Sequence, residues 1–336
     1  MERRIVVRNA RISVNDRTPS GLFIVLAILA LVLLNFIYLS YGIGMMGEFV
    51  ENPLPFKLTG AIVYTKGVIV PCLLVLHIYW AQKGGRFVLA RLNVLVLFLS
   101  GMFDMYVYKS RGALLFQAFP LGLVWLLAGF RLYKFDKLIL VLVLTVTFLF
   151  IPVVTALRFD SPLEPFPINQ IVDGFNFTFF RITGIDQFMV ILNLGDPISI
   201  DNLWSVLSSP RGIAGYYTTQ LLNYGEHIPQ TFAPSMLGWL YLVGGLPGIM
   251  GGMVFLAFLA TYMWNFFGLF YPKCGPVVKS YFLMFLLLTM TEGIAQGIII
   301  SFIIVAVLLW FMEKHLLIWK KARPAPQIND VNLGQA

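Results

Sequence analysis

The chain has 336 residues, of which 59% are hydrophobic and only 12% are charged, and its formal net charge is +8. Soluble domains carry about 25% charged residues, so this composition excludes an ordinary soluble protein and predicts an all-α, polytopic membrane protein. The basic residues lie in short segments between apolar runs rather than on one soluble face, so no nucleic-acid partner is expected.

Apolar runs that are long enough to cross a hydrocarbon core of ~30 Å predict about eight transmembrane helices. The first run, 21–41, is too long for a signal-peptide core, so it is expected to remain as a signal anchor after a polar segment 1–20. One helix over 280–311 would reach ~48 Å, too far for one crossing, so the polar residues 291–297 predict a tight turn between spans seven and eight. The remaining predicted spans are 59–80, 92–105, 113–130, 138–157 and one within 238–270, and a cytoplasmic tail is predicted over 314–336.

Orientation follows from the distribution of Lys and Arg, which favour the cytoplasmic side. Eight spans with a cytoplasmic N-terminus leave 17 of the 24 basic residues inside, with both termini cytoplasmic and residues 158–235 outside. This external segment holds seven of the sixteen carboxylates and is rich in Phe, Tyr, Leu and Ile. Disordered segments are poor in aromatic and apolar residues, so the segment is predicted to be a folded external lid over a membrane-embedded site.

The seven basic residues left outside or within a span oppose the insertion bias and together predict an external anion site. They are Lys57, Lys66, Lys109, Arg111, Arg158, Arg181 and Arg211. Lys109 and Arg111 flank Ser110 at the mouth of span four, where Arg offers a bidentate fork and Lys a point charge for phosphate. The alternative for this pair is snorkelling to lipid headgroups.

The external segment also contains the candidates for acid–base chemistry and substrate binding. Glu226 and His227 are adjacent just before span six, and a histidine can act as a general base near neutral pH; a plain loop role is the alternative. Tyr217 and Tyr241 could stack on sugar rings or belong to an interfacial aromatic belt. Asp186 ends a Thr183-Gly-Ile-Asp capping box behind Arg181, so it is either a helix cap or a group that contacts substrate.

Two polar residues fall within or beside predicted spans. Lys66 lies about a third of the way into span two, and an ionisable residue at that depth is functional or paired. Its candidate partners are Asp104 and Glu292, both predicted near the external side. Cys72 and Cys274 are predicted to be free thiols. The sequence has no Cys/His cluster with metal-ligand spacing and no Gly-rich phosphate loop, so neither a metal nor a cofactor is expected.

Three features together resemble the Wzy-type polymerases of bacterial O-antigen and exopolysaccharide synthesis, over roughly residues 103–252. They are the Lys109-Ser110-Arg111 turn that opens a span, the long external loop with spaced Arg, and the stretch from Thr231 to Gly245, TFAPSMLGWLYLVGG. The last stretch looks like the family's Pro…Gly…Leu-Tyr…Gly approach to a late span.

The resemblance implies a glycosyltransferase of the bacterial inner membrane that joins undecaprenyl-pyrophosphate-linked oligosaccharide repeats on the periplasmic face. Arg111, Lys109, Arg181 and Arg211 would then neutralise the pyrophosphate, and Glu226 or His227 would deprotonate the acceptor hydroxyl. A chain-length regulator and a flippase are the expected protein partners, besides membrane lipid. The alternatives are a transporter or flippase for lipid-linked sugars and a non-catalytic subunit of envelope polysaccharide assembly.

Overall fold

The computed structural model describes residues 20–43, 55, 58–108, 113–130, 134, 136–142, 145–146, 149, 172, 185–209, 212–223 and 233–321. Within these residues, helices are the only regular secondary structure. The α-helices are α1 (Ser20–Tyr41), α2 (Leu58–Tyr64), α3 (Val70–Lys83), α4 (Phe87–Tyr108), α5 (Ala113–Ala128), α8 (Ile185–Leu194), α9 (Ile200–Ser208), α10 (Gly212–Tyr216), α11 (Ser235–Phe270), α12 (Gly275–Glu292) and α13 (Gln296–Lys321). Two π-helical turns, Thr65–Ile69 and Tyr217–Leu221, continue α2 and α10.

Five helical stretches of the described chain are long and apolar enough to cross a membrane: Gly21–Tyr41, Leu58–Lys83, Phe87–Val107, Ser235–Phe270 and Gln296–Lys314. A sixth apolar stretch, Gln117–Ala128 in α5, is shorter. The prediction of an all-α, multi-pass membrane protein is therefore confirmed, while the number of eight spans stays a prediction. The predicted fifth span, 138–157, lies mostly outside the described residues.

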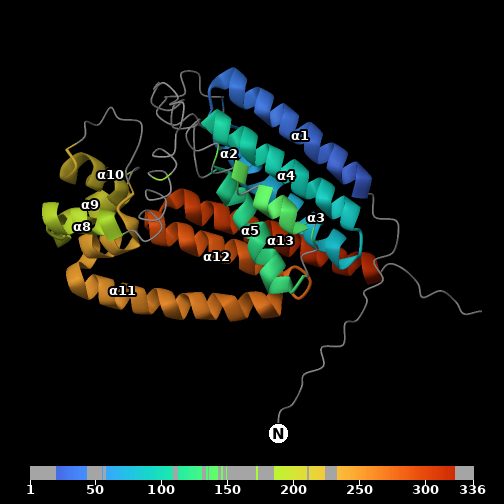
Figure 1. Ribbon diagram of the computed structural model, residues 1–336. Coiled ribbons are helices and arrows are strands. Elements are labelled where there is room, and N and C mark those ends of the chain that lie inside the picture. Colours follow the sequence, from blue (N-terminus) through green and yellow to red (C-terminus); the bar gives the residue numbers. More distant parts are fainter. Residues whose placement is uncertain are drawn as a thin grey trace, which may run out of the picture.

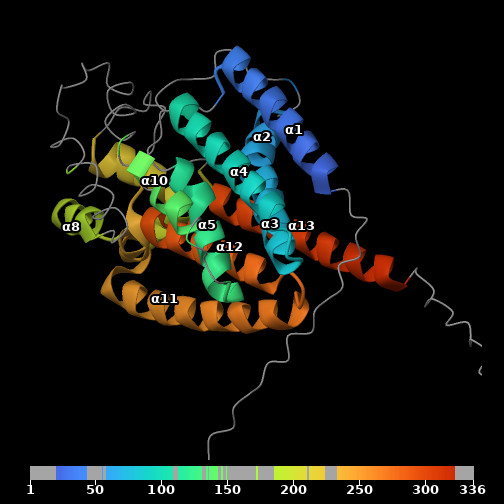
Figure 2. The same cartoon turned by 45° about the vertical axis from the view of Figure 1, so that its right-hand side comes forward.

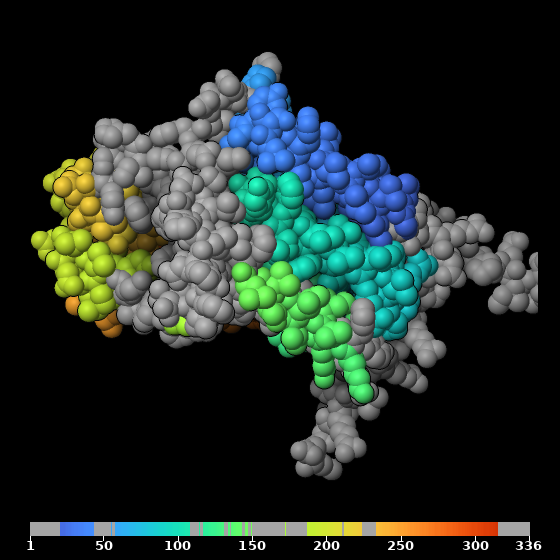
Figure 3. Space-filling view, turned by 45° about the horizontal axis from the view of Figure 1, so that its top comes forward, coloured from blue at the N-terminus to red at the C-terminus, as the bar shows by residue number. Residues whose placement is uncertain are grey.

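The long helices form one bundle with a small helical group at one end (Figure 1). Helix α12 packs against α5, α11 and α13, and α4 packs against α1, α3 and α5. The view turned by 45° keeps the same neighbours together (Figure 2). One face shows α1 and α4 as adjacent strips of side chains (Figure 3). The main apolar core draws on α1, α3, α4, α5, α11, α12 and α13, which ties the spans into one unit.

Several predicted boundaries hold and others move. Helix α12 ends at Glu292, Gly293 has a φ of +76°, and α13 begins at Gln296, so the predicted turn within 291–297 is confirmed. The start of span three at 92 was wrong: α4 begins at Phe87, because the helix extends beyond the N-terminal end of the predicted apolar run, through Arg91. The candidate span in α13 ends at Lys314 and the helix itself continues to Lys321, so the cytoplasmic tail over 314–336 stays a prediction.

Helix α11 changes direction near its start. Gly244 and Gly245 leave helical geometry, and Gly245 has φ +62° and ψ −152°, a region that is essentially restricted to glycine. The first part of α11 folds back over the second: a Cβ at Gly248 would lie 2.7 Å from the carbonyl oxygen of Leu240, and one at Gly252 would lie 2.3 Å from Leu240 Cδ2. Glycine at these positions therefore permits the close contact of the two arms.

The short helices surround this first arm and form what we call the cap, which consists of α8, α9, α10 with its π-turn, and residues 235–243. Its own apolar core contains Ile191, Ile198, Ile213, Tyr217 and Leu242. The backbone N–H of Ile198 donates to the carbonyl of Leu242 over 2.8 Å, which fixes the α8–α9 connection to the α11 arm. The cap stands at one end of the bundle in Figure 1.

Candidate functional site

A buried ion pair joins the second and third spans. The ammonium Nζ of Lys66 lies 2.7 Å from Asp104 Oδ1, and the two side chains are 0% and 2% exposed. Ionisable residues inside a membrane bundle are costly and are by default functional or paired. The predicted intramembrane Lys66 is therefore paired, and its partner is Asp104, one of the two candidates named from the sequence.

Local sequence places Lys66 on a widened turn of the helix. Pro71 has no N–H, so it cannot donate to the carbonyl of Gly67, and its ring crowds that carbonyl. The π-helical turn Thr65–Ile69 lies directly before it, and the N–H of Val70 bonds five residues back to Thr65. Single π-turns inside α-helices are frequent at functional sites. This turn directs Lys66 into the bundle, where its side chain is fully buried.

A third polar side chain, Gln117 of α5, completes the group that we call the ionic cluster: Lys66, Asp104 and Gln117. The Gln117 amide donates to Asp104 Oδ2. Gly101 makes this contact possible, because a Cβ there would lie 2.5 Å from Leu114 Cδ1 and would push α5 away from α4. The cluster thus joins three helices through one carboxylate.

Aromatic rings enclose the charged end of Lys66. Its Nζ lies 4.1 Å from the ring centroid of Tyr38 on α1 and 5.6 Å from that of Phe103. A cation over an aromatic face is attracted by about 0.5–2 kcal/mol, more where water is excluded. The rings supply part of the solvation that Lys66 loses on burial, and they bring α1 to the same site.

The ionic cluster lies close to the end of the bundle that carries the cap. Asp104 is four residues from the end of α4, a rise of about 6 Å. Tyr64, two residues before Lys66, places its hydroxyl 3.9 Å from a Cβ built on Gly297, at the start of α13. The α12–α13 turn in turn meets the cap, because a Cβ at Gly293 would lie 3.2 Å from Trp239 and 3.3 Å from the carbonyl of Ser235.

The cap contains a second irregular backbone segment. Ser235 is fully buried and has a φ of +59°, which is uncommon for a residue with a side chain. The π-turn Tyr217–Leu221 follows α10, and Thr218 and Thr219 donate back to the carbonyls of Ala214 and Gly215. Ser235 lies where the external segment was predicted to return to the membrane.

All six predicted catalytic and phosphate-binding residues lie outside the described part of the chain: Glu226, His227, Lys109, Arg111, Arg181 and Arg211. Lys109 and Arg111 belong to the connection between α4 and α5, and Arg211 directly precedes α10. The chain therefore attaches these residues to the ends of elements that hold the ionic cluster and the cap, and their roles stay predictions.

Three predicted substrate-contacting residues lie in the cap. Tyr217 is 3% exposed and belongs to the cap's core. Tyr241 is half-buried, and its ring meets Phe188 edge-on with centroids 6.1 Å apart. Asp186 is the second residue of α8, which fits its predicted place at the start of a helix. Glu292 is the last residue of α12, at the cap end of the bundle.

Sequence reasoning missed Gln117, Tyr38 and Glu313. Gln117 had a usable signal, since it is the one strongly polar side chain in the predicted span 113–130. Glu313 is 2% exposed at the opposite end of the bundle and accepts the backbone N–H groups of Lys273 and Cys274 ahead of α12. Both cysteines are free, as predicted, and burial followed by the charge of Glu313 raises the pKa of the Cys274 thiol.

In the described residues, no group of three or more His, Cys, Asp and Glu side chains is gathered as a metal site would require. Comparisons with protein-family models, with curated proteins and with solved structures found no match to this chain.

Proposed function

We propose that this protein is a polysaccharide polymerase that joins lipid-linked oligosaccharide repeats at the cap end of the bundle. The observation that carries the proposal is the cap itself, built on the folded-back arm of α11. An enzyme for lipid-linked sugars needs apolar helices for the lipid chain and a folded element for the glycan at one end of them. The bundle and the cap supply these two parts.

The ionic cluster supports the same location for the phosphate chemistry. Asp104 and Gln117 sit near the two ends of the α4–α5 connection that contains Lys109 and Arg111. The contact fixes the two helix ends that the connection joins, and fixed helix ends favour a bidentate phosphate clamp between them. The cluster thereby serves as a positioning element for the proposed pyrophosphate site.

In the proposed reaction, the acceptor sugar hydroxyl attacks the anomeric carbon of the donor glycan as the bond to pyrophosphate breaks. The hydroxyl proton passes to Glu226 or His227, which would have to lie within about 3 Å of it. Lys109, Arg111, Arg181 and Arg211 stabilise the negative charge of the departing undecaprenyl pyrophosphate. The products are a longer lipid-linked glycan and the freed lipid pyrophosphate.

The predicted orientation of the chain in the membrane agrees with this proposal. The basic residues predicted to be cytoplasmic include Lys83, Arg86 and Lys273, and these belong to the α3–α4 and α11–α12 connections. Those connections lie at the end opposite the cap in Figure 1. With both termini cytoplasmic, the cap is periplasmic, the side on which lipid-linked repeats are polymerised in the resembling family.

A transporter or flippase for lipid-linked sugars is the second candidate. It is favoured by the interrupted α11, together with a buried ion pair on a π-turn, because broken helices and intramembrane charges are common at transport sites. The two functions differ in where lipid-linked repeats accumulate when activity is lost. The third candidate function is that of a non-catalytic subunit in envelope polysaccharide assembly.

The decisive experiment compares His227→Ala and Glu226→Gln with Asp201→Asn, an exposed carboxylate of α9 with no assigned role. Loss of the base should leave single repeats on lipid, exposed on the outer face of spheroplasts to an added lectin, while Asp201→Asn keeps long polymer. Repeats that accumulate on the inner face would favour the flippase. Long polymer in both test variants would remove the assignment of the base.

A further inference from the structure

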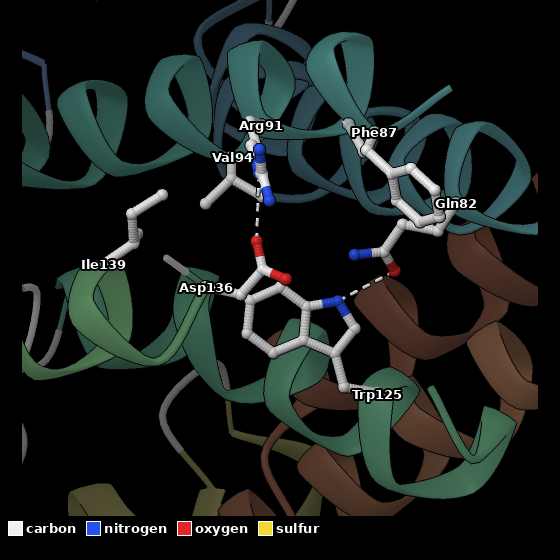
Figure 4. A pocket seen from close by; sticks show the side chains of 8 residues that line it. Gln82, Phe87, Arg91, Val94, Trp125, Asp136 and Ile139 are labelled. Carbon is white, nitrogen blue, oxygen red and sulfur yellow. Dashed lines mark hydrogen bonds and ion pairs between the residues drawn. The ribbon is translucent and has the colours of Figure 1, made fainter. Parts of the chain in front are cut away.

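Polar side chains at the end of the bundle away from the cap satisfy one another around a small hollow (Figure 4). Arg91 Nε donates to Asp136 Oδ1 over 3.1 Å. Trp125 Nε1 donates to Gln82 Oε1 over 2.9 Å. These contacts join α3, α4 and α5 within the chain itself. The cap differs, because its helix α9 leaves apolar side chains uncovered.

Three side chains form what we call the apolar stripe of α9: Ile200, Trp204 and Leu207. They are 88%, 78% and 40% exposed. Their spacing of four and three residues places them on one face of the helix. Neighbouring apolar side chains that stay exposed in a folded protein mark a surface for lipid or for a partner.

The faces of α9 follow a definite order around its axis. At about 100° per residue, the stripe lies about a quarter turn from Leu203 and Val206, which pack against the core of the cap. The polar side chains Asn202, Ser205 and Ser208 occupy the side opposite to the core, where all three are exposed. The stripe therefore lies at the flank of the cap rather than at its outer surface. A helix with one apolar flank and one polar face fits the boundary between a bilayer and water.

The start of α9 is attached to the end of a lipid-exposed helix. The backbone N–H of Ile198 donates to the carbonyl of Leu242 over 2.8 Å, and Pro197 lies 3.5 Å from a Cβ built on Gly245. Directly after this bend, Leu246 is 65% exposed within a stretch of α11 that is long and apolar enough to cross a membrane. The apolar stripe thus begins beside a surface that already faces lipid.

The composition of α9 favours apolar contact over electrostatic attraction. Its nine residues include one charged side chain, that of Asp201. Helices that are held by anionic lipids carry Lys and Arg on their polar face. Tryptophan, in contrast, is enriched where headgroups meet hydrocarbon. Trp204 therefore suits a boundary with neutral lipid.

We propose that α9 lies on the bilayer surface beside α11, with its apolar stripe in the headgroup and upper acyl region of the leaflet on the cap side. The partner is the lipid surface itself. The contact gives the cap a second attachment to the membrane besides the arm of α11. It applies to a polymerase, a transporter or an assembly subunit alike, so it does not rest on the proposed function.

Spin labels on single introduced cysteines test this contact in the full chain. Both native cysteines are buried, so the unsubstituted chain gives the background. Trp204→Cys and Leu207→Cys place the label on the stripe, and Leu207→Cys retains Trp204 as the anchor. Ser205→Cys is the matched control, since Ser205 is exposed on the polar side of the same helix. In nanodiscs of phosphatidylcholine, collisions of each label with oxygen, which concentrates in lipid, are compared with collisions with a water-soluble nickel chelate.

We expect the ratio of oxygen to nickel collisions to be several-fold higher for Trp204→Cys and Leu207→Cys than for Ser205→Cys. The difference should persist at about 1 M salt, because the contact is apolar. Equal ratios at the three positions, or a difference that salt abolishes, would overturn the proposal. Shielding of the stripe from both reagents would assign it to a protein contact instead. A stripe that is open to water until an oligosaccharide is added would be a sugar-binding surface, which also overturns the proposal.

Discussion

Lys66 and Asp104 form an ion pair that is fully enclosed by helices from three parts of the chain, with Nζ and Oδ1 2.7 Å apart. Removing one partner of a buried pair leaves an uncompensated charge and costs about 3–5 kcal/mol, whereas replacing both is often nearly neutral. We therefore expect Lys66→Met and Asp104→Asn each to lower thermal stability in detergent strongly, and the double variant to recover most of the loss.

The partly exposed pair of Arg91 and Asp136 provides the control for the single and double variants of Lys66 and Asp104. Its side chains are 35% and 12% exposed, so Asp136→Asn should cost about 0–1 kcal/mol. Single variants of Lys66 and Asp104 that add their effects in the double variant would show that the two groups do not interact. If the double variant recovers stability but loses polymer, the pair positions the site as well as the fold.

The sequence predicted the spans more reliably than the contacts between them. Length and hydropathy identified α1, the 58–83 stretch and the α12–α13 turn, because these depend on the local chain alone. Lys66 was predicted to be functional or paired because it lies well inside a predicted span. Gln117 was not paired with Asp104, because that contact depends on the close approach of α4 and α5 at Gly101, which no spacing within one helix reveals.

The fold-back of α11 shows the same limit. The stretch from Gly238 to Gly252 is rich in glycine, but the contacts of Leu240 with Gly248 and Gly252 require the whole arm to reverse over itself, which composition does not reveal. Glu313 was missed because its partners, the N–H groups before α12, are about forty residues away in the chain. Long-range pairing of this kind follows from packing, not from pattern.

Glu313 should hold the α11–α12 connection in place. Its carboxylate accepts from Cys274 N–H over 2.9 Å at the N-terminus of α12, where both the hydrogen bonds and the helix dipole favour a negative charge. Glu313→Gln keeps the shape and loses the charge, so we expect a loss of about 1–2 kcal/mol in stability. Asp201→Asn, an exposed carboxylate on α9, should have little effect.

The reactivity of the Cys274 thiol measures whether Glu313 still contacts the start of α12. Burial and then the neighbouring carboxylate of Glu313 raise the pKa of its thiol, so the reactive thiolate is scarce in the folded protein even at mildly alkaline pH. We expect very slow labelling by a maleimide in the intact protein and faster labelling in Glu313→Gln, with Cys72→Ser as background to isolate Cys274. Rapid labelling without unfolding would show that the 271–274 turn is open.

Topology can be tested independently of function. The cap and the connections rich in Lys and Arg lie at opposite ends of the bundle (Figure 1), so reporter fusions at Asp201 and at the C-terminus should report opposite sides of the membrane. A fusion at Gly85, in the α3–α4 turn, should agree with the C-terminus. Agreement between Asp201 and Gly85 would contradict the orientation and, with it, a periplasmic polymerase site.

The bend in α11 predicts that alanine lowers stability at two glycines of this helix and raises it at a third. Gly245→Ala introduces a side chain at φ +62°, a strain of about 1–3 kcal/mol, and Gly252→Ala places its Cβ 2.3 Å from the Leu240 side chain. Gly251→Ala meets nothing within 4 Å and should stabilise the helix by about 0.5–1 kcal/mol.

Leu240→Ala should rescue Gly252→Ala, because it removes the clashing methyl groups, but should not rescue Gly245→Ala, whose strain is in the backbone. Thermal unfolding of the four single and two double variants in detergent measures all of these terms. Equal effects at Gly251 and Gly252 would mean that the two arms of α11 do not pack as the structure shows.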